Sequence, residues 1–186
     1  MRVVGGSRKG RKLFSVKGPS TRPTSDMVRE AVFDVLQAEG PFERVLDLFA
    51  GTGAMGIEAL SRGSVEVVFV DSAARAAAVI RKNLEACGFE GAARVLKKDA
   101  LSSLSYLAGK GESFDLVFMD APYREASLAA DTLRALADGG VLTPGAVVIC
   151  EADRRTEFDT EVEGLELLKR KRYGDTAVYF FRYKER

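Results

Sequence analysis

The sequence predicts an α/β fold in which helices cover both faces of a mostly parallel sheet. From about residue 44, short runs rich in Val, Leu, Ile and Phe alternate with segments that carry Ala, Leu, Arg and Glu at helical spacing. Glycines follow the first run directly, and two further strand-like runs end the chain. Parallel neighbours need a helical crossover, so the alternation predicts right-handed units and the final pair predicts an antiparallel C-terminal edge. A Rossmann-like sheet is therefore expected.

Each element can be given a range. The expected strands are 44–49, 65–71, 93–99, 114–120 and 145–151. The helices expected between them are 54–62, 73–87, 100–109 and 126–138. The tail "LELLKRKRYGDTAVYFFRYKER" predicts two strands joined at Gly174-Asp175. In the second of these strands, alternation assigns one face to Ala177, Tyr179 and Phe181 and the other face to Val178, Phe180 and Arg182.

A further helix precedes the alternation. "TSDMVREAVFDVLQAEG" follows Pro23, starts near Thr24 or Ser25 and stops at Gly40-Pro41. Helical spacing predicts an apolar face of Met27, Val28, Ala31, Val32, Val35 and Leu36. Residues 1–23 are expected to form a small basic, β-rich arm, and residues 24–186 a single domain.

Composition narrows the functional classes. The 186 residues contain no histidine and only Cys87 and Cys150, so neither a zinc site nor a Ser-His-Asp triad can be built, and buried free thiols are expected. No apolar run approaches a membrane span, and the first residues lack a secretory core, which predicts a cytoplasmic protein. Residues 1–29 carry eight basic side chains against one acid, so a net charge of +7 there leaves −6 elsewhere. A basic arm favours an anionic polymer as partner, although a solvated tail is the alternative.

The first strand leads into "DLFAGTGAMG", in which Gly51, Gly53 and Gly56 satisfy the pattern G-x-G-x-x-G. Such glycines allow positive φ and close approach of a ligand, and the pattern fits a dinucleotide as well as S-adenosylmethionine. Asp71 ends the second strand and is placed to accept hydrogen bonds from ribose hydroxyls. Asp47 favours S-adenosylmethionine over a dinucleotide, because its carboxylate would repel a pyrophosphate and attract the ammonium group of S-adenosylmethionine.

Asp99 closes the third expected strand and is placed to contact the adenine amino group. Each acid taken singly could instead be a strand-end or capping residue. Acids after the first four strands nevertheless converge, because ligands bind at the carboxyl ends of strands in open α/β sheets. The expected cofactor-binding residues are Asp47, Phe49, Ala50, Gly51, Thr52, Gly53, Asp71, Ser72, Asp99 and Ala100.

This combination resembles the class I S-adenosylmethionine-dependent methyltransferases. "DAPY", residues 120–123, is similar to the D/N-P-P-Y/F motif of enzymes that methylate exocyclic amines of nucleobases or glutamine amides. The resemblance implies that Asp120 and the carbonyl of Ala121 hold the target amine, that Pro122 keeps the backbone extended, and that Tyr123 stacks on the base. Ala121 departs from the usual proline, which predicts somewhat less rigid backbone. An ordinary Asp-x-Pro turn is the structural alternative.

The resemblance extends over the whole chain. "RVVGGSRKGRKL", "RPTSDMVREAVFDVL", "DLFAGTGAMGIEALSRG", "DAPY" and "YGDTAVYFF" resemble, in order and spacing, the bacterial RsmD-type family, which methylates N2 of one guanine in small-subunit (16S) ribosomal RNA. The resemblance implies that residues 24–186 are an S-adenosylmethionine-dependent methyltransferase domain, that the base is extruded from its stack, and that the arm grips RNA. It implies no metal and no membrane partner, and a monomer is expected.

Basic side chains supply the expected RNA contacts. Those assigned to phosphates are Arg8, Lys9, Arg11 and Arg22, although each could be a solvated charge. Arg29 and Glu30 could form a structural ion pair. The cluster "KRKRY", residues 169–173, is either a second RNA contact or a charged edge strand that guards against aggregation.

Three other functions stay open at the level of sequence. An N6-adenine DNA or protein glutamine methyltransferase would use the same motif, but such enzymes usually need a recognition domain for which this chain has no room. A nicotinamide-dependent oxidoreductase would share the glycine loop, but Asp47 opposes it. A catalytically idle RNA-binding module would bind RNA without turnover.

Overall fold

The computed structural model describes residues 1–16, 26–122, 126–155 and 160–185 of the chain. They contain a seven-stranded sheet with the order β3-β2-β1-β4-β5-β7-β6. The strands are β1 (Arg44–Leu48), β2 (Glu66–Val70), β3 (Ala93–Leu96), β4 (Phe114–Met119), β5 (Leu142–Asp153), β6 (Leu165–Tyr173) and β7 (Thr176–Tyr183). The helices are α1 (Asp26–Leu36), α2 (Ala54–Ser61), α3 (Ala74–Cys87), α4 (Ala100–Gly109) and α5 (Ala126–Asp138), with short 3-10 turns at Gly6–Arg8 and Glu90–Ala92.

The first five strands are parallel, as the alternation predicts, and helical connections join them. The chain moves from β1 to β2 and β3 on one side and then returns to place β4 on the other side of β1. The order of the strands therefore reverses between β1 and β4. A crevice at the carboxyl ends of the strands forms at such a reversal, and ligands of open α/β sheets bind in it.

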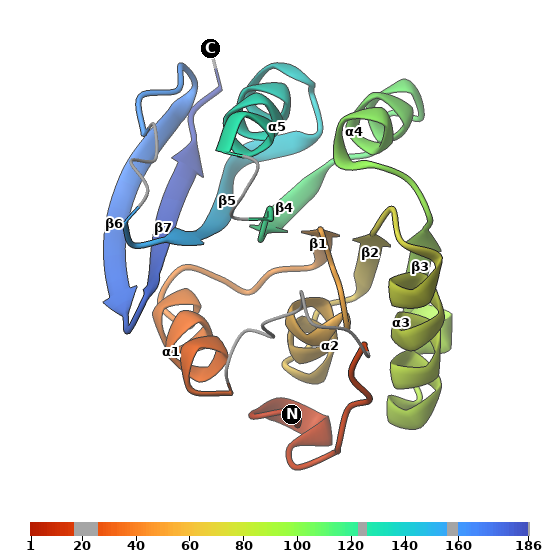
Figure 1. The fold of residues 1–186 in the computed structure, drawn as a ribbon. Helices are drawn as coiled ribbons and strands as arrows, with labels where there is room; N and C mark the ends of the chain where they lie inside the picture. Colours follow the sequence, from red (N-terminus) through yellow and green to blue (C-terminus); the bar gives the residue numbers. More distant parts are fainter. Residues whose placement is uncertain (17–25, 123–125, 156–159, 186) are drawn as a thin grey trace.

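The sheet separates two hydrophobic cores, one on each face, and Figure 1 shows the helices that cover these faces. Helices α4 and α5 pack on one face, and α1, α2 and α3 pack on the other. Successive strand residues point to opposite faces, so Leu46 and Leu48 belong to the first core and Val45 to the second. Asp47 shares the second face and is almost fully buried there.

The antiparallel C-terminal edge is confirmed. β7 inserts between β5 and β6 and pairs antiparallel with both. The turn that joins β6 to β7 consists of Gly174 and Asp175, and Gly174 has a φ of 57°, which a glycine adopts without strain. The predicted alternation of β7 also holds, because Tyr179 and Phe181 lie in one core and Val178 and Phe180 in the other.

The predicted face of α1 is partly wrong. Val28, Val32 and Leu36 are buried as expected, but Met27 is 71% exposed, and the buried face also contains Arg29 and Phe33. The prediction used apolar residues only and so excluded Arg29, which is charged. The predicted face of α1 was therefore displaced by about one position towards the N-terminus. Arg29 is fully buried and belongs to a polar network described below.

The N-terminal residues form a small hairpin that packs on the domain. Arg2 and Lys12 make an antiparallel bridge, and Val3 and Leu13 are buried in the core that contains α1, α2 and α3. The start of the arm is therefore β-like, as expected, and shares its core with the domain. The boundary expected at residue 23 lies outside the described residues.

Candidate cofactor and amine site at the carboxyl edge of the sheet

The loop between β1 and α2 turns sharply through three residues of positive φ. Phe49 has a φ of 60°, Gly51 of 56° and Gly53 of 75°. A non-glycine residue in this region is strained, and such strain persists where the surrounding structure enforces it, often at ligand sites. A Cβ added at Gly51 would meet only the carbonyl oxygen of Phe49, at 3.9 Å, so this side of the loop is open. The backbone can accept a close ligand there.

Gly56, the third glycine, has a packing role. A Cβ at this position would lie 2.4 Å from Cε1 of Phe69 and 2.8 Å from Cγ1 of Val67, both on β2. Only a glycine lets α2 approach the sheet this closely. Gly53 begins the helix as its left-handed N-cap. The loop and the helix that follows it are thus held against the sheet.

Asp71 ties the loop to β2. Its Oδ2 accepts a hydrogen bond from the backbone N–H of Gly51 at 2.8 Å, and its Oδ1 accepts one from Ala73 at 2.8 Å. A carboxylate has about four acceptor positions, so both oxygens keep capacity for the hydroxyls of a ribose. The expected ribose contact stays a prediction. Ser72, beside it, is exposed.

Asp47 is buried beneath the loop. Its Oδ2 accepts a hydrogen bond from the N–H of Gly56 at 3.0 Å, and the residue is 3% exposed. Burial raises its pKa to about 8, the Gly56 hydrogen bond opposes the rise, and the charge of Asp71 adds to it. The ionised form is therefore disfavoured until a cation approaches, which suits a carboxyl that receives a positively charged group.

Asp120 follows the last residue of β4 directly. Burial raises its pKa well above the usual range, and the negative charges of Glu151 and Asp47 raise it further. The strand register brings the three acids together: Asp47 pairs with Phe118, two residues before Asp120. The residues that precede Asp120 and Glu151 pair with each other across β4 and β5. Sequence reasoning missed Glu151, which ends the apolar run "GAVVICE"; extending the strand-end rule from four strands to five would have found it.

The rest of the "DAPY" motif is only partly described. Ala121 is 5% exposed and belongs to the core beneath α4 and α5, and Pro122 is exposed. Tyr123 lies outside the described residues. Among the described residues, no group of three His, Cys, Asp or Glu side chains is arranged to hold a metal ion.

Asp99 caps a helix, which is the alternative to cofactor binding that the sequence left open for it. It is the N-cap of α4, and its Oδ1 accepts a hydrogen bond from the N–H of Ser102 at 2.9 Å, which lowers its pKa. β3 accordingly ends at Leu96, earlier than the expected residue 99. Ala100, the first residue of α4, is buried. The adenine contact expected of Asp99 and the cofactor contact expected of Ala100 stay predictions.

One buried amide joins the cofactor loop to the arm. Nδ2 of Asn83, on α3, donates to the carbonyl of Thr52 at 2.9 Å and to the carbonyl of Phe14 at 3.0 Å. Its Oδ1 accepts from the N–H of Phe14 at 2.7 Å. Ala50, on the other side of the loop, donates its N–H to the carbonyl of Val70 at 2.9 Å. Nothing in the local pattern around Asn83 indicated this role.

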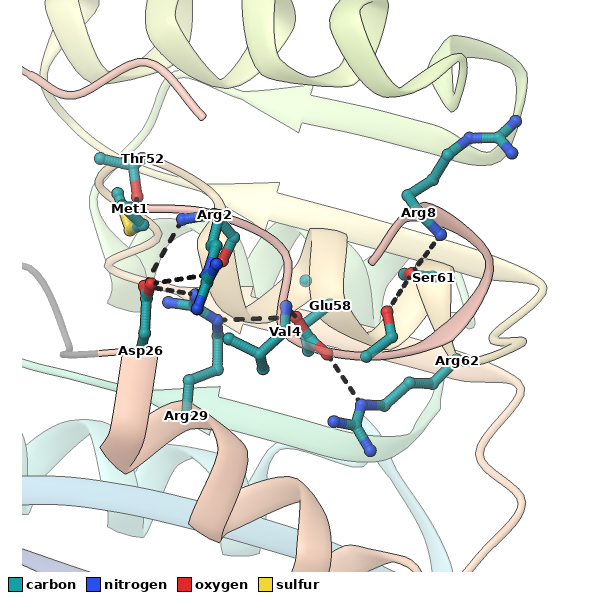
Figure 2. Close-up of polar contacts among 12 residues, drawn as sticks. Met1, Arg2, Val4, Arg8, Asp26, Arg29, Thr52, Glu58, Ser61 and Arg62 are labelled. Carbon is teal, nitrogen blue, oxygen red and sulfur yellow. Dashed lines mark hydrogen bonds and ion pairs between the residues drawn. The ribbon is translucent and has the colours of Figure 1, made fainter. Parts of the chain in front are cut away.

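The arm itself is anchored by polar contacts to α2 (Figure 2). The N–H of Val4 donates to Oε2 of Glu58 at 2.8 Å, and the N–H of Arg8 donates to Oγ of Ser61 at 2.9 Å. Glu58 is fully buried and also pairs with Arg29 at 3.6 Å and with Arg62 at 2.8 Å. The sequence offered Arg29 and Glu30 as a possible structural ion pair, whereas the structure pairs Arg29 with Glu58 and with Asp26, the latter at 2.9 Å.

The four basic residues assigned to phosphates differ in their surroundings. Nε of Arg8 donates to the carbonyl of Cys87 at 2.6 Å, and its guanidinium lies 5.4 Å from the ring centre of Phe89, so this side chain stabilises the end of α3. Lys9 and Arg11 are exposed on the hairpin. Arg22 lies outside the described residues. The expected RNA contacts stay predictions.

The described part of the chain has no helix that is both long and apolar enough to cross a membrane.

Comparison with known proteins assigns the chain to a family. A family model described as "Conserved hypothetical protein 95" matches residues 1–182. The Bacillus subtilis protein YlbH is 38% identical over 98% of both chains. "Ribosomal RNA small subunit methyltransferase D" of Escherichia coli is 34% identical and covers 97% of this chain and 89% of its own.

Solved structures agree with the sequence matches. The protein yhhF of Escherichia coli is 32% identical and superimposes with a TM-score of 0.84 over 100% of this chain and 99% of its own. The fold, the glycine loop with its surrounding acids, and the matches over nearly the full length all indicate the same family. The chain therefore belongs to the RsmD-type family, whose model is described as Conserved hypothetical protein 95, within the class I S-adenosylmethionine-dependent methyltransferases.

Proposed function

We propose that this protein transfers the methyl group of S-adenosylmethionine to the exocyclic N2 amine of a guanine in small-subunit (16S) ribosomal RNA, in the bacterial cytoplasm. The observation that carries the proposal is the position of Asp120, which directly follows β4 and lies two residues beyond Phe118, the partner of Asp47 in the pairing of β1 with β4. The named relative that methylates small-subunit ribosomal RNA supports the substrate class. The choice of guanine N2 rests on the family resemblance of the sequence.

The residues around the loop suit this cofactor. S-adenosylmethionine supplies a methyl group already activated on a sulfonium. Asp47 is a buried acid whose ionised form a cationic ammonium would stabilise. Gly51 leaves the loop backbone open to the ligand, and Asp71 retains acceptor capacity for a ribose. A dinucleotide would bring a pyrophosphate against the same buried acid, which disfavours it.

Asp120 and the carbonyl of Ala121 would orient the amine. The lone pair of a guanine amine is delocalised into the ring, so transfer requires a geometry in which that pair points at the methyl carbon. Two fixed acceptors for the amine hydrogens impose this orientation and stabilise the positive charge that develops on nitrogen. The amine proton becomes acidic as the new bond forms, and in this proposal the Asp120 carboxylate receives it. No histidine is needed for this chemistry.

The test incubates the protein with methyl-labelled S-adenosylmethionine and small subunits from cells that lack this activity, followed by nucleoside mass spectrometry. The wild type is expected to form N2-methylguanosine at one site. Asp120→Ala is expected to abolish transfer, because it removes a contact to the amine. The variant is expected to fold and to bind the cofactor, because the substitution leaves no buried cation without its acid. Asp120→Asn, which keeps one acceptor oxygen, is the matched control and is expected to retain residual transfer.

Two results would contradict the proposal. Label on an adenine, on DNA or on a protein amide, with none on ribosomal RNA, would retain the transfer chemistry and reject the substrate. Wild-type turnover by Asp120→Ala would remove this residue from the mechanism.

A further inference from the structure

We propose that the basic segment of β6, defined as Lys169, Arg170, Lys171 and Arg172, binds phosphates of the RNA strand that flanks the target nucleotide. β6 is the outermost strand of the sheet, beyond β7 (Figure 1). All four side chains of the segment are exposed. This inference rests on the proposed function and adds a second RNA surface to it, at the edge of the sheet opposite to β3 and α3 (Figure 1).

The strand register places the segment level with the proposed amine site, which consists of Asp120 and the carbonyl of Ala121. Met119, the residue before Asp120, pairs with Cys150 of β5, which pairs with Tyr179 of β7, which pairs with Arg170. In the next row, Glu151 of β5 pairs with Val178, which pairs with Lys171. Three strand intervals therefore separate β4 from β6, or about 14 Å at roughly 4.8 Å per interval. A short stretch of single-stranded RNA can span this distance from an extruded base.

The two lysines also share a face of the sheet with the acids. Lys169 and Lys171 stand opposite Phe180 and Val178, which lie on the same face as Asp47. Arg170 and Arg172 stand on the other face, where the guanidinium of Arg170 lies 5.1 Å from the ring centre of Tyr179. A strand of phosphates passing along this edge would meet cations on both faces.

The charges of the segment are not neutralised by acids of the described part of the chain; the ring of Tyr179, which lies beside Arg170, carries no charge. None of its four side chains makes an ion pair with a described residue, whereas Lys184, on the same hairpin, pairs with Glu166 at 2.9 Å. Four adjacent cations repel one another and gain when counterions or phosphates neutralise them. Phosphate binding provides that neutralisation and releases the counterions.

Protection of an edge strand is the competing explanation for these charges. Charged residues on an edge do discourage pairing with another chain, and either sign of charge serves. The exposed apolar residues of β6, however, are Leu167 and Leu168, each 39% exposed, in the half of the strand away from the amine site. The four cations instead occupy the half next to the carboxyl edge and have a single sign. This distribution fits an RNA contact better than edge protection.

The experiment compares two double variants that remove equal charge. Lys169→Gln/Lys171→Gln removes two cations of the segment. Lys110→Gln/Lys184→Gln is the matched control, because both of its lysines are exposed and lie at the amino edge of the sheet. Binding to protein-free 16S ribosomal RNA and to small subunits is measured from 0.05 to 0.2 M salt, alongside S-adenosylmethionine affinity and methyl transfer.

The segment variant is expected to bind RNA more weakly, with a salt slope smaller by about 1.4, or roughly 0.7 for each lost phosphate contact to a single strand. Its affinity deficit should therefore shrink about sevenfold between the two salt concentrations. Cofactor affinity should not change, and Lys169→Arg/Lys171→Arg should restore the slope. The control should match the wild type.

A segment variant whose slope equals that of the wild type, while the wild type methylates RNA, would overturn this inference alone and leave β6 as a guarded edge. Equal losses in both double variants would also overturn it, since they would reflect overall charge. A wild type that binds the cofactor but neither binds nor methylates ribosomal RNA would reject the proposed function and, with it, this inference.

Discussion

Truncation of Glu58 gives the sharpest test of how the arm is held. The side chain is fully buried in α2 and contacts Arg29, Arg62 and the N–H of Val4 (Figure 2). Glu58→Ala leaves Arg29, which is itself 0% exposed, without this carboxylate. Removing one partner of a buried ion pair costs about 3–5 kcal/mol. For a chain of this length, about 2–4 °C per kcal/mol converts this to a fall in Tm of roughly 6–20 °C.

The assay is thermal unfolding followed by circular dichroism, with urea denaturation as a second measure of the free energy. Asp131→Ala is the control, because it breaks the exposed Asp131–Arg134 pair on α5 and should cost less than about 1 kcal/mol. Arg29→Met/Glu58→Met should recover most of the loss, since apolar side chains can replace a buried pair. A loss below 1 kcal/mol for Glu58→Ala, or no coupling in the double variant, would refute the reasoning.

Three further predictions follow from the site. Gly56→Ala should destabilise the protein by about 1–3 kcal/mol in urea denaturation, because its Cβ would lie 2.4 Å from Phe69, whereas Gly91→Ala, with nothing within 4 Å, should cost little. Asp71→Ala should weaken S-adenosylmethionine binding in calorimetry, because it removes the acceptor that holds Gly51 and faces the expected ribose; unchanged affinity would mean that the ribose is misplaced. The pKa of Asp47 is raised from 3.8 to about 8 in the folded protein, so between these values the folded state binds the extra proton. The free energy of unfolding without ligand should therefore fall as pH rises from about 4 to 8. Asp120, whose pKa is also raised, contributes in the same direction. Asp47→Asn should therefore reduce the slope, and a profile parallel to that of the wild type would contradict the assignment.

Local patterns predicted much of the fold. The apolar runs predicted the strands, and their alternation with helices predicted that the strands are parallel. The turn at Gly174-Asp175 predicted the C-terminal hairpin. The cofactor loop was predicted from three glycines after a strand, because positive φ and close packing require glycine at particular positions. These features depend on residues close together in the chain, and such residues leave a readable period or spacing.

Contacts between distant residues were not predictable in the same way. Glu58 accepts from Val4, 54 residues earlier, and Asn83 joins Phe14 to Thr52 across 69 and 31 residues. A buried acid or amide in a helix has the same local signature as an exposed one. The face of α1 was misplaced for this reason, since only the tertiary structure supplies the partner that lets Arg29 be buried.

The sequence by itself therefore determined the class of the fold, the glycine loop, and the positions of Asp71 and Asp120 directly after their strands, because each is encoded in short spacing. Only the tertiary structure decided that Glu151 joins Asp47 and Asp120, that Arg8 stabilises α3, and that the basic segment of β6 stands level with the amine site. The physical reason is strand order. β7 inserts between β5 and β6, and this pairing of distant segments sets which side chains share an edge of the sheet.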